Sequence, residues 1–352
     1  MAKRIKIESS SIFNGNPITV GVQPEVITEG TDDMGHPITP SFHRVLLEVE
    51  CGMSGGNFET IPLFAPVLRE VDSADNWVYF DVSSALRSFR DSYHYQPEPC
   101  AYPLVKFAVR AYDEYMISGE LHQTTATRFP VEKHLSTVFG GRSDWERVTQ
   151  NPAVQHFSRK PNDGVELVAV GDSFVYAEDY DAPRILSTAD LPQPSSREIK
   201  VTTEGAQILG NRKVFALPAS EGAKRAVFRF INSFGVMESV SVPMAWQRTL
   251  DMEAKRYVVT RRETLGDFQR LAVNKQLGRE RWAFLTDPLT EDWISWYLHE
   301  LLSSEHVWVQ HKGQWIPCVL TADESVTFID ESKREMLSLS FTAELAWRGP
   351  LG

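Results

Sequence analysis

The segment that most constrains the fold is residues 225–243, RAVFRFINSFGVMESVSVP. Two β-prone runs, residues 226–231 and 236–242, flank the four residues 232–235. Gly235 supplies the positive φ that favours a chain reversal of this length. We predict a β-hairpin with one strongly apolar face, formed by Phe228, Phe230, Val236, Val240 and Val242. The same alternation recurs along the chain and predicts an antiparallel β protein, in which functional residues would lie on loops.

The N-terminal region, residues 1–128, is predicted to be a β-sandwich. Strands are expected at residues 45–51, 77–80 and 104–112, with residues 115–121 returning beside the third. A short helix capped by a serine is expected after residue 82, with Ala85, Leu86 and Phe89 turned inward. Short strands separated by Gly and Pro are typical of sandwiches.

The middle region, residues 129–195, is less regular. Residues 132–139 fit either a short helix or a buried extended run, and residues 145–157 are ambiguous. Residues 166–170 and 174–177 predict a hairpin joined by residues 171–173. The two prolines of residues 191–196 predict a stiff linker and the main domain boundary, with one or two domains before Ser195.

The C-terminal region, residues 196–352, is predicted to be a β-rich domain with one amphipathic helix at about 291–303. Thr290 is its expected N-cap, and Trp293, Tyr297 and Leu301 recur on one face. The expected strands are residues 199–203, 213–217, 257–260, 306–310, 315–320, 325–329 and 337–345. The fold class is therefore mainly β, with tandem antiparallel β-sandwich-like domains.

Length, charge and cysteine content limit the number of domains and the kinds of function that this chain can have. A chain of 352 residues exceeds the size of one core, so two or three domains are expected. A formal net charge of −11 argues against nucleic-acid binding, and Lys255-Arg256 and Arg261-Arg262 are interpreted as solvated strand ends. Three widely spaced cysteines, Cys51, Cys100 and Cys318, predict reduced thiols and folding in a cytoplasm. No apolar stretch approaches the roughly 20 residues of a membrane span.

The candidate motifs for catalysis and metal binding all have simpler explanations. Residues 52–56 match G-x-S-x-G around Ser54, but residues 57–62 cannot begin the helix that a nucleophile elbow requires. His306 and His311 are five residues apart, on opposite faces of a predicted strand. The acidic turns, residues 178–181 and 32–33, do not fit a calcium loop. No phosphate-binding glycine loop is present. We therefore predict no catalytic, cofactor-binding or metal-ligating residue and no cofactor.

The aromatic residues suggest a second kind of function. Tryptophan faces stack on sugars, so a carbohydrate-binding site is an alternative hypothesis. Trp293 and Trp296 lie on the predicted helix, and Trp308, Trp315 and Trp347 lie in β runs, so core packing is predicted for most of them. Paired carboxylates for glycoside hydrolysis stay open because their separation depends on the fold.

Several short segments resemble tail-associated structural proteins of Bacteroidetes phages and prophages. The resemblance lies in residues 228–235, 301–304, 307–309, 315–318 and 341–344, and in the N-terminal half in residues 80–83 with Leu86. It implies a β-rich module of a virion tail, tail tip or baseplate-like assembly, without catalytic residues. It also implies localisation in the virion after folding in the host bacterial cytoplasm.

Three functional hypotheses follow. The first is a non-enzymatic structural protein of a phage tail, working as a homo-oligomeric ring with other tail proteins, without nucleic acid or membrane. The second is an adhesion or carbohydrate-binding β-sandwich module, which predicts exposed tryptophans. The third is a hydrolase that uses Ser54 or scattered loop carboxylates.

Overall fold

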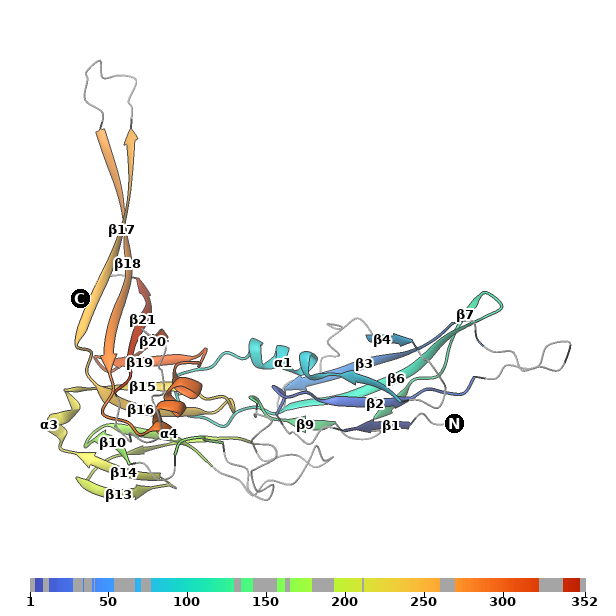
Figure 1. Ribbon diagram of the computed structural model, residues 1–352, viewed down its shortest axis with the longest axis horizontal. Helices are drawn as coiled ribbons and strands as arrows, with labels where there is room; N and C mark the ends of the chain where they lie inside the picture. The colour runs from blue at the N-terminus through green and yellow to red at the C-terminus, as the bar shows by residue number, and fades with distance from the viewer. Residues whose placement is uncertain are drawn as a thin grey trace, which may run out of the picture.

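The computed structural model is elongated, with an N-terminal arm and a C-terminal body (Figure 1). The strands β17 and β18 rise from the body, away from the long axis of the arm (Figure 1). The described residues are 4–8, 13–27, 34, 40, 42–53, 67–70, 77–129, 134–141, 157–161, 165–178, 193–210, 212–259, 270–322 and 338–348. Predicted features at Ser54, Asp32, Asp33, Trp145 and residues 179–181 and 325–329 lie outside them.

The N-terminal arm confirms the predicted sandwich. One sheet has the order β1-β2-β5, and the other has the order β4-β3-β6-β7, with β8 and β9 also paired to β6. Alternating side chains of β3 and β6 form one buried face, as predicted, and pack in one core with β2 and β5. The strands are β1 (Arg4–Ile7), β2 (Thr19–Gln23), β3 (Phe42–Met53), β4 (Val67–Glu70), β5 (Val78–Asp81), β6 (Val105–Ile117), β7 (Glu120–Gln123), β8 (Thr127–Phe129) and β9 (Leu135–Thr137).

The helix of the arm, α1 (Ser83–Ser92), forms where predicted, and its predicted inward residues are buried. The predicted serine cap is wrong. Val82 occupies the N-cap position, and the carboxylate of Asp81 accepts a hydrogen bond from the Ser83 backbone N–H at 2.9 Å. The same carboxylate accepts one from the Ile18 N–H at 3.3 Å, so it links the helix start to strand β2.

The chain reversal after β6 lies later than predicted. β6 continues to Ile117, and the turn is formed by Ser118 and Gly119, which both have positive φ (51° and 83°). This is the backbone geometry of a two-residue hairpin. Residues 115–121 therefore contain the end of one strand and the turn, rather than a single returning strand.

The middle region contains both predicted strands, but they do not pair with each other. β10 (Glu166–Ala169) pairs in parallel with β14 (Arg212–Leu217), which also pairs with β13 (Gly205–Leu209). β11 (Ser173–Ala177) pairs with β12 (Ser196–Lys200). The predicted hairpin is wrong: the Asp172 N–H donates to the Ala169 carbonyl in a local turn, but the two strands that the turn joins enter different sheets. Of the two alternatives for residues 132–139, the extended run is correct for β9.

The described end of the predicted linker is firmly held. The Tyr102 N–H donates to the Pro194 carbonyl at 2.7 Å, and the Ser196 N–H donates to the Cys100 carbonyl at 3.1 Å. The Tyr102 hydroxyl lies 3.0 Å from the Ser196 hydroxyl. Residues 193–196 therefore pack on the arm, while residues 191–192 of the predicted stiff linker lie outside the described residues.

The C-terminal body is a seven-stranded antiparallel sheet with the order β16-β15-β19-β20-β21-β18-β17. Its strands and the short helix that precedes β15 are α3 (Ala219–Gly222), β15 (Arg225–Ile231), β16 (Met237–Pro243), β17 (Gln247–Val259), β18 (Arg270–Leu285), β19 (Val307–His311), β20 (Gln314–Ala322) and β21 (Ser340–Arg348). The predicted amphipathic helix is confirmed as α4 (Glu291–Trp296) continuing into the π-helical turn η1 (Tyr297–Leu301). Its aromatic face packs on one face of the sheet.

The predicted hairpin is confirmed as β15 and β16, and Gly235 has φ +77°. Its apolar face, with Phe228, Phe230, Val240 and Val242, belongs to the core under α4. The prediction is wrong for Val236, which precedes β16 and belongs to the core of the arm. The opposite face is buried too, since Ile231 and Met237 belong to the core of the arm. The hairpin therefore separates two cores and joins the arm to the body.

Candidate functional site

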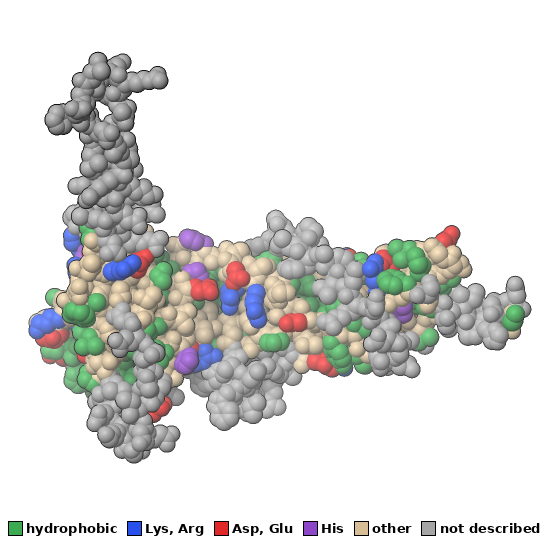
Figure 2. Space-filling model, turned by 45° about the horizontal axis from the view of Figure 1, so that its top comes forward, with side chains coloured by type: hydrophobic (Ala, Val, Ile, Leu, Met, Phe, Trp, Pro, Cys, Tyr) green, Lys and Arg blue, Asp and Glu red, His purple; other side chains and the backbone are tan. Residues whose placement is uncertain are grey.

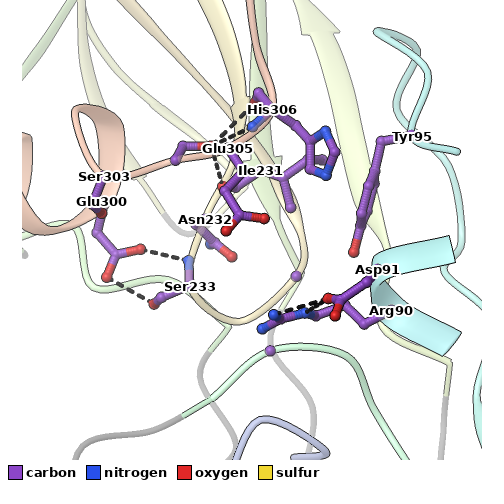
Figure 3. A pocket seen from close by; sticks show the side chains of 13 residues that line it. Arg90, Asp91, Tyr95, Ile231, Asn232, Ser233, Glu300, Ser303, Glu305 and His306 are labelled. Carbon is purple, nitrogen blue, oxygen red and sulfur yellow. Dashed lines mark hydrogen bonds and ion pairs between the residues drawn. The ribbon is translucent and has the colours of Figure 1, made fainter. Parts of the chain in front are cut away.

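A cavity of about 260 Å³ lies where the arm meets the body. Its wall combines the end of α1, the turn of the β15–β16 hairpin and the loop after η1 (Figure 3). Tyr95 and His306 face each other there, with ring centroids 4.7 Å apart. The lining carries both charge signs, from Arg90, Asp91 and Glu305.

The hairpin turn is shaped by Asn232. Its side-chain oxygen accepts hydrogen bonds from the backbone N–H groups of Phe234 and Val236, each at 3.1 Å. Its amide donates to the Phe157 carbonyl at 2.7 Å. Asn is favoured in turns for this kind of local bonding, and here it also fixes the middle region to the turn. The turn therefore has one conformation, with Ser233 presented to η1.

A buried ion pair locks this turn to the helix. Glu300, whose side chain is fully buried, accepts from Arg159 Nη1 at 2.6 Å. It also accepts from the Ser233 backbone N–H and hydroxyl, each at 2.8 Å (Figure 3). The Arg159 guanidinium stacks over Phe234, 4.3 Å from the ring centroid. Burial raises the pKa of the Glu300 carboxyl, and the positive charge of Arg159 opposes that rise.

A second buried pair lies deeper in the middle region. Lys160 Nζ donates to Glu166 at 2.7 Å and to the Ser239 carbonyl at 2.6 Å, so β10 is tied to β16. The same ammonium lies 5.2 Å from the centroid of Trp296 on α4. Burial raises the pKa of the Glu166 carboxyl, with Lys160 acting against the rise. One lysine thus connects the middle region, the sheet and the helix.

Arg229 fixes the arm to the outer face of the sheet. Its guanidinium donates to the Pro97 carbonyl at 2.7 Å and to Glu198 at 2.6 Å, and it stacks 4.2 Å from the Trp315 ring centroid. Burial lowers the pKa of this guanidinium, and Glu198 opposes the shift. The contacts join residues from three separate parts of the chain.

The polar side chains of the junction hold backbone segments in position. The Ser233 hydroxyl donates to a carboxylate that already neutralises Arg159, and the Ser304 hydroxyl donates to the Ile231 carbonyl at 2.7 Å. Burial lowers the pKa of His306, whose ring lies tilted against that of Tyr95. The Ser304 hydroxyl bonds to the backbone of His306, donating to its carbonyl at 3.1 Å and accepting from its N–H at 3.3 Å. An activated nucleophile needs a base within hydrogen-bond reach. Within the described lining, the polar groups hold backbone segments in place.

The histidines and tryptophans considered in the sequence analysis lie in different environments. His306 lies in the junction, while His311 packs against Trp282 with ring centroids 5.0 Å apart. No group of three or more metal-ligating side chains occurs within the described ranges. Core packing is confirmed for Trp293, Trp296 and Trp308, and Trp315 is partly buried.

Sequence reasoning missed the residues that build the junction, Arg159, Ser233, Glu300 and Arg229. One signal was available, because Glu300 lies on the helix beside the buried residues Trp296, Tyr297 and Leu301. A carboxylate within an apolar helix face implies a buried partner. The partner, Arg159, lies 141 residues earlier and cannot be identified from local pattern.

Comparison of the chain with protein-family models, curated proteins and solved structures gave no match. None of the helices in the described part of the chain has the length and apolar character needed to cross a membrane. On the face drawn in Figure 2, Lys and Arg side chains lie close to Asp and Glu side chains rather than in a patch of one sign. The function is therefore argued from the architecture.

Proposed function

We propose that this chain is a non-enzymatic structural protein of a phage tail or prophage-derived injection machine, acting through protein–protein contacts. The observation that carries the proposal is the extended architecture, in which an arm, a body and a projecting pair of strands point in different directions (Figure 1). Such a shape offers separate surfaces to several neighbours at once.

The junction supports a mechanical role. Glu300 and Lys160 tie the middle region to the body, and Arg229 ties the body to the arm at Pro97, in addition to the apolar packing between arm and body. Buried ion pairs contribute less to stability than to a unique arrangement in some systems. A defined angle between two β modules is useful to a part that must fit identical neighbours.

The kind of assembly comes from the resemblance to tail-associated proteins of Bacteroidetes phages. The resembling residues 228–235 cover the end of β15 and the hairpin turn of the junction, and residues 301–304 cover the end of η1 and the loop that faces this turn. In the proposed role the protein folds in the host cytoplasm, joins a homo-oligomeric ring with other tail proteins and remains in the virion. Nucleic acid and membrane are not partners in this proposal.

The test is to purify particles from cells that carry the coding sequence and to quantify the protein in them by mass spectrometry. We expect a fixed ratio to other tail proteins across gradient fractions, and immunogold labelling at one position on the particle. Absence from intact particles, with the protein found free in the lysate, would contradict the proposal.

One observation favours the alternative of a carbohydrate-binding module. Trp246, directly before β17, is 65% exposed, unlike the buried tryptophans of the sheet and helix. Exposed aromatic faces are what a sugar-stacking site requires. The alternative predicts a ligand-dependent change in tryptophan fluorescence that disappears in Trp246→Ala, and a silent glycan array would contradict it.

A further inference from the structure

The strands β17 and β18 extend beyond the sheet that carries them. β18 pairs with β21 only over residues 279–285, whereas its ladder with β17 continues out to Val259 and Arg270. Both ladders shift register at the departure point, between Leu250 and Met252 and between Arg279 and Arg281. We call the backbone of residues 252–259 and 270–277 the ribbon. Figure 1 shows it standing clear of the other described strands.

A two-stranded ribbon is an incomplete β structure. An isolated pair of strands is marginally stable in water, and stability comes with further strands or a covering surface. The ribbon has eight paired positions, from Met252↔Leu277 to Val259↔Arg270, without a third described strand on either edge. Unpaired strand edges are templates for contact with another chain. A partner surface is therefore the simplest reason to maintain a ribbon of this length.

The net charge of the ribbon indicates the charge of the partner surface. Residues 252–259 and 270–277 contain four Lys and Arg against one Glu, a formal charge of +3. The whole chain has a formal net charge of −11, so the remainder carries −14. A basic projection on an acidic chain is complementary to another copy of that chain, and such complementarity steers association and selects partners.

We infer that the β17–β18 ribbon docks one copy of this chain onto the acidic body or arm of a second copy. The two surfaces in this contact are different, so it is a head-to-tail contact. Contacts of this kind close into rings or grow into filaments, depending on the rotation between neighbours. The inference rests on the proposed assembly role and names the surface that performs it.

The first test removes the ribbon while keeping the sheet. Leu250 and Glu280 are paired, so replacing residues 251–279 with an Asn-Gly turn closes the ladder at this pair. We expect the wild type to self-associate with rising concentration in sedimentation velocity at low salt. The shortened variant is expected to stay at its monomer mass with the near-UV circular dichroism of the wild type.

The second test changes charge and leaves the ribbon in place. Lys255→Glu, Arg256→Glu and Lys275→Glu together change the ribbon charge by −6. The matched control is Lys200→Glu, Lys213→Glu and Lys224→Glu, three exposed positions on the body with the same change in net charge. We expect at least tenfold weaker self-association in the ribbon variant, and a much smaller effect in the control. Association of the wild type should also weaken between about 0.05 and 0.5 M salt, as screening predicts.

Four outcomes would overturn the inference. The first is a wild type that is monomeric at every concentration, and the second is a shortened variant that associates as tightly as the wild type. The third is an equal effect of the two charge variants on self-association. The fourth is self-association that nuclease treatment abolishes. The last would identify nucleic acid as the occupant of the ribbon. These outcomes can be distinguished from failure of the proposed tail role. A protein that is monomeric in solution but present at a constant ratio in particles would overturn only the contact between copies.

Discussion

Glu300 on η1 and Ser233 in the β15–β16 turn, 67 residues apart, are joined by two hydrogen bonds of 2.8 Å. One is donated by the backbone N–H of Ser233 and the other by its hydroxyl, and each reaches a different oxygen of the carboxylate. With Arg159 on the same carboxylate, this contact couples the helix, the turn and the middle region.

Removing the Glu300 carboxylate should lower the free energy of unfolding far more than removing the Ser233 hydroxyl. Glu300→Ala leaves the Arg159 charge without this acceptor and the Ser233 N–H unbonded, a change that destabilises proteins by about 3–5 kcal/mol. Ser233→Ala removes one neutral donor and should cost about 1 kcal/mol. Urea unfolding monitored by near-UV circular dichroism measures both. Equal costs would show that the ion pair does not hold the junction.

The same carboxylate predicts a pH dependence. Burial raises the pKa of Glu300 above its ordinary 4.5, so the folded state holds the proton more tightly than the unfolded state. Its contribution to stability is fully present below pH 4.5 and is lost as the pH rises through the folded pKa. Glu300→Gln has no such proton. The stability advantage of wild type over Glu300→Gln should therefore be larger near pH 4.5 than at pH 7, and a pH-independent difference would contradict the buried, ionisable role.

A matched pair of glycines tests how closely the arm approaches the hairpin. Gly140 and Gly171 have similar positive φ values, +95° and +99°. A Cβ on Gly140 would lie 2.3 Å from the Phe234 carbonyl carbon, whereas one on Gly171 meets nothing within 4 Å. Gly171→Ala should cost about 1–2 kcal/mol from backbone strain alone. Gly140→Ala should cost several kcal/mol more or prevent folding. Thermal unfolding measures the difference, and similar melting temperatures would refute the close approach.

The individual strands were largely predictable because their alternation is local. β3, β6 and the visible part of β21 show in sequence which residues face a core, and the structure buries those residues. Gly235 indicated the hairpin turn because a positive φ is favoured by glycine itself and does not depend on distant residues. The length of α4 with η1 followed from the spacing of aromatic residues in the same way.

Pairing and the junction were not predictable, because they depend on residues far apart in sequence. β10 and β11 look like a hairpin around residues 171–173, but Val170 and Gly171 donate to the carbonyls of Leu217 and Val201. Arg229 lies between Phe228 and Phe230 in sequence, and its contacts with Pro97, Glu198 and Trp315 have no local signal. No local pattern distinguishes a solvated arginine from one with partners over a hundred residues away.

Arg229 should matter much more than an exposed arginine on the same sheet. Its side chain is 5% exposed, and Arg229→Ala removes two charged hydrogen bonds and the stacking on Trp315. We expect a loss of about 2–4 kcal/mol. Arg281 is 51% exposed and pairs with Glu344, so Arg281→Ala should cost less than about 1 kcal/mol. Chemical denaturation measures both, and a fluorescence change from Trp315 in the Arg229 variant alone would locate the effect. Indistinguishable midpoints would argue against the Arg229 contacts as a clamp.

The three cysteines should react at different rates. Cys100 is exposed, whereas Cys51 and Cys318 are buried, and burial raises the pKa of both buried thiols to about 12. Since the thiolate is the reactive form, a disulfide reagent at pH 8 should modify one thiol in the native protein and three after denaturation. The unfolded thiols ionise near pH 9.0, so stability from the two buried thiols is present below that pH and is lost as the pH rises towards about 12. Cys100→Ser should leave no fast-reacting native thiol, and fast modification in that variant would contradict the burial of Cys51 and Cys318.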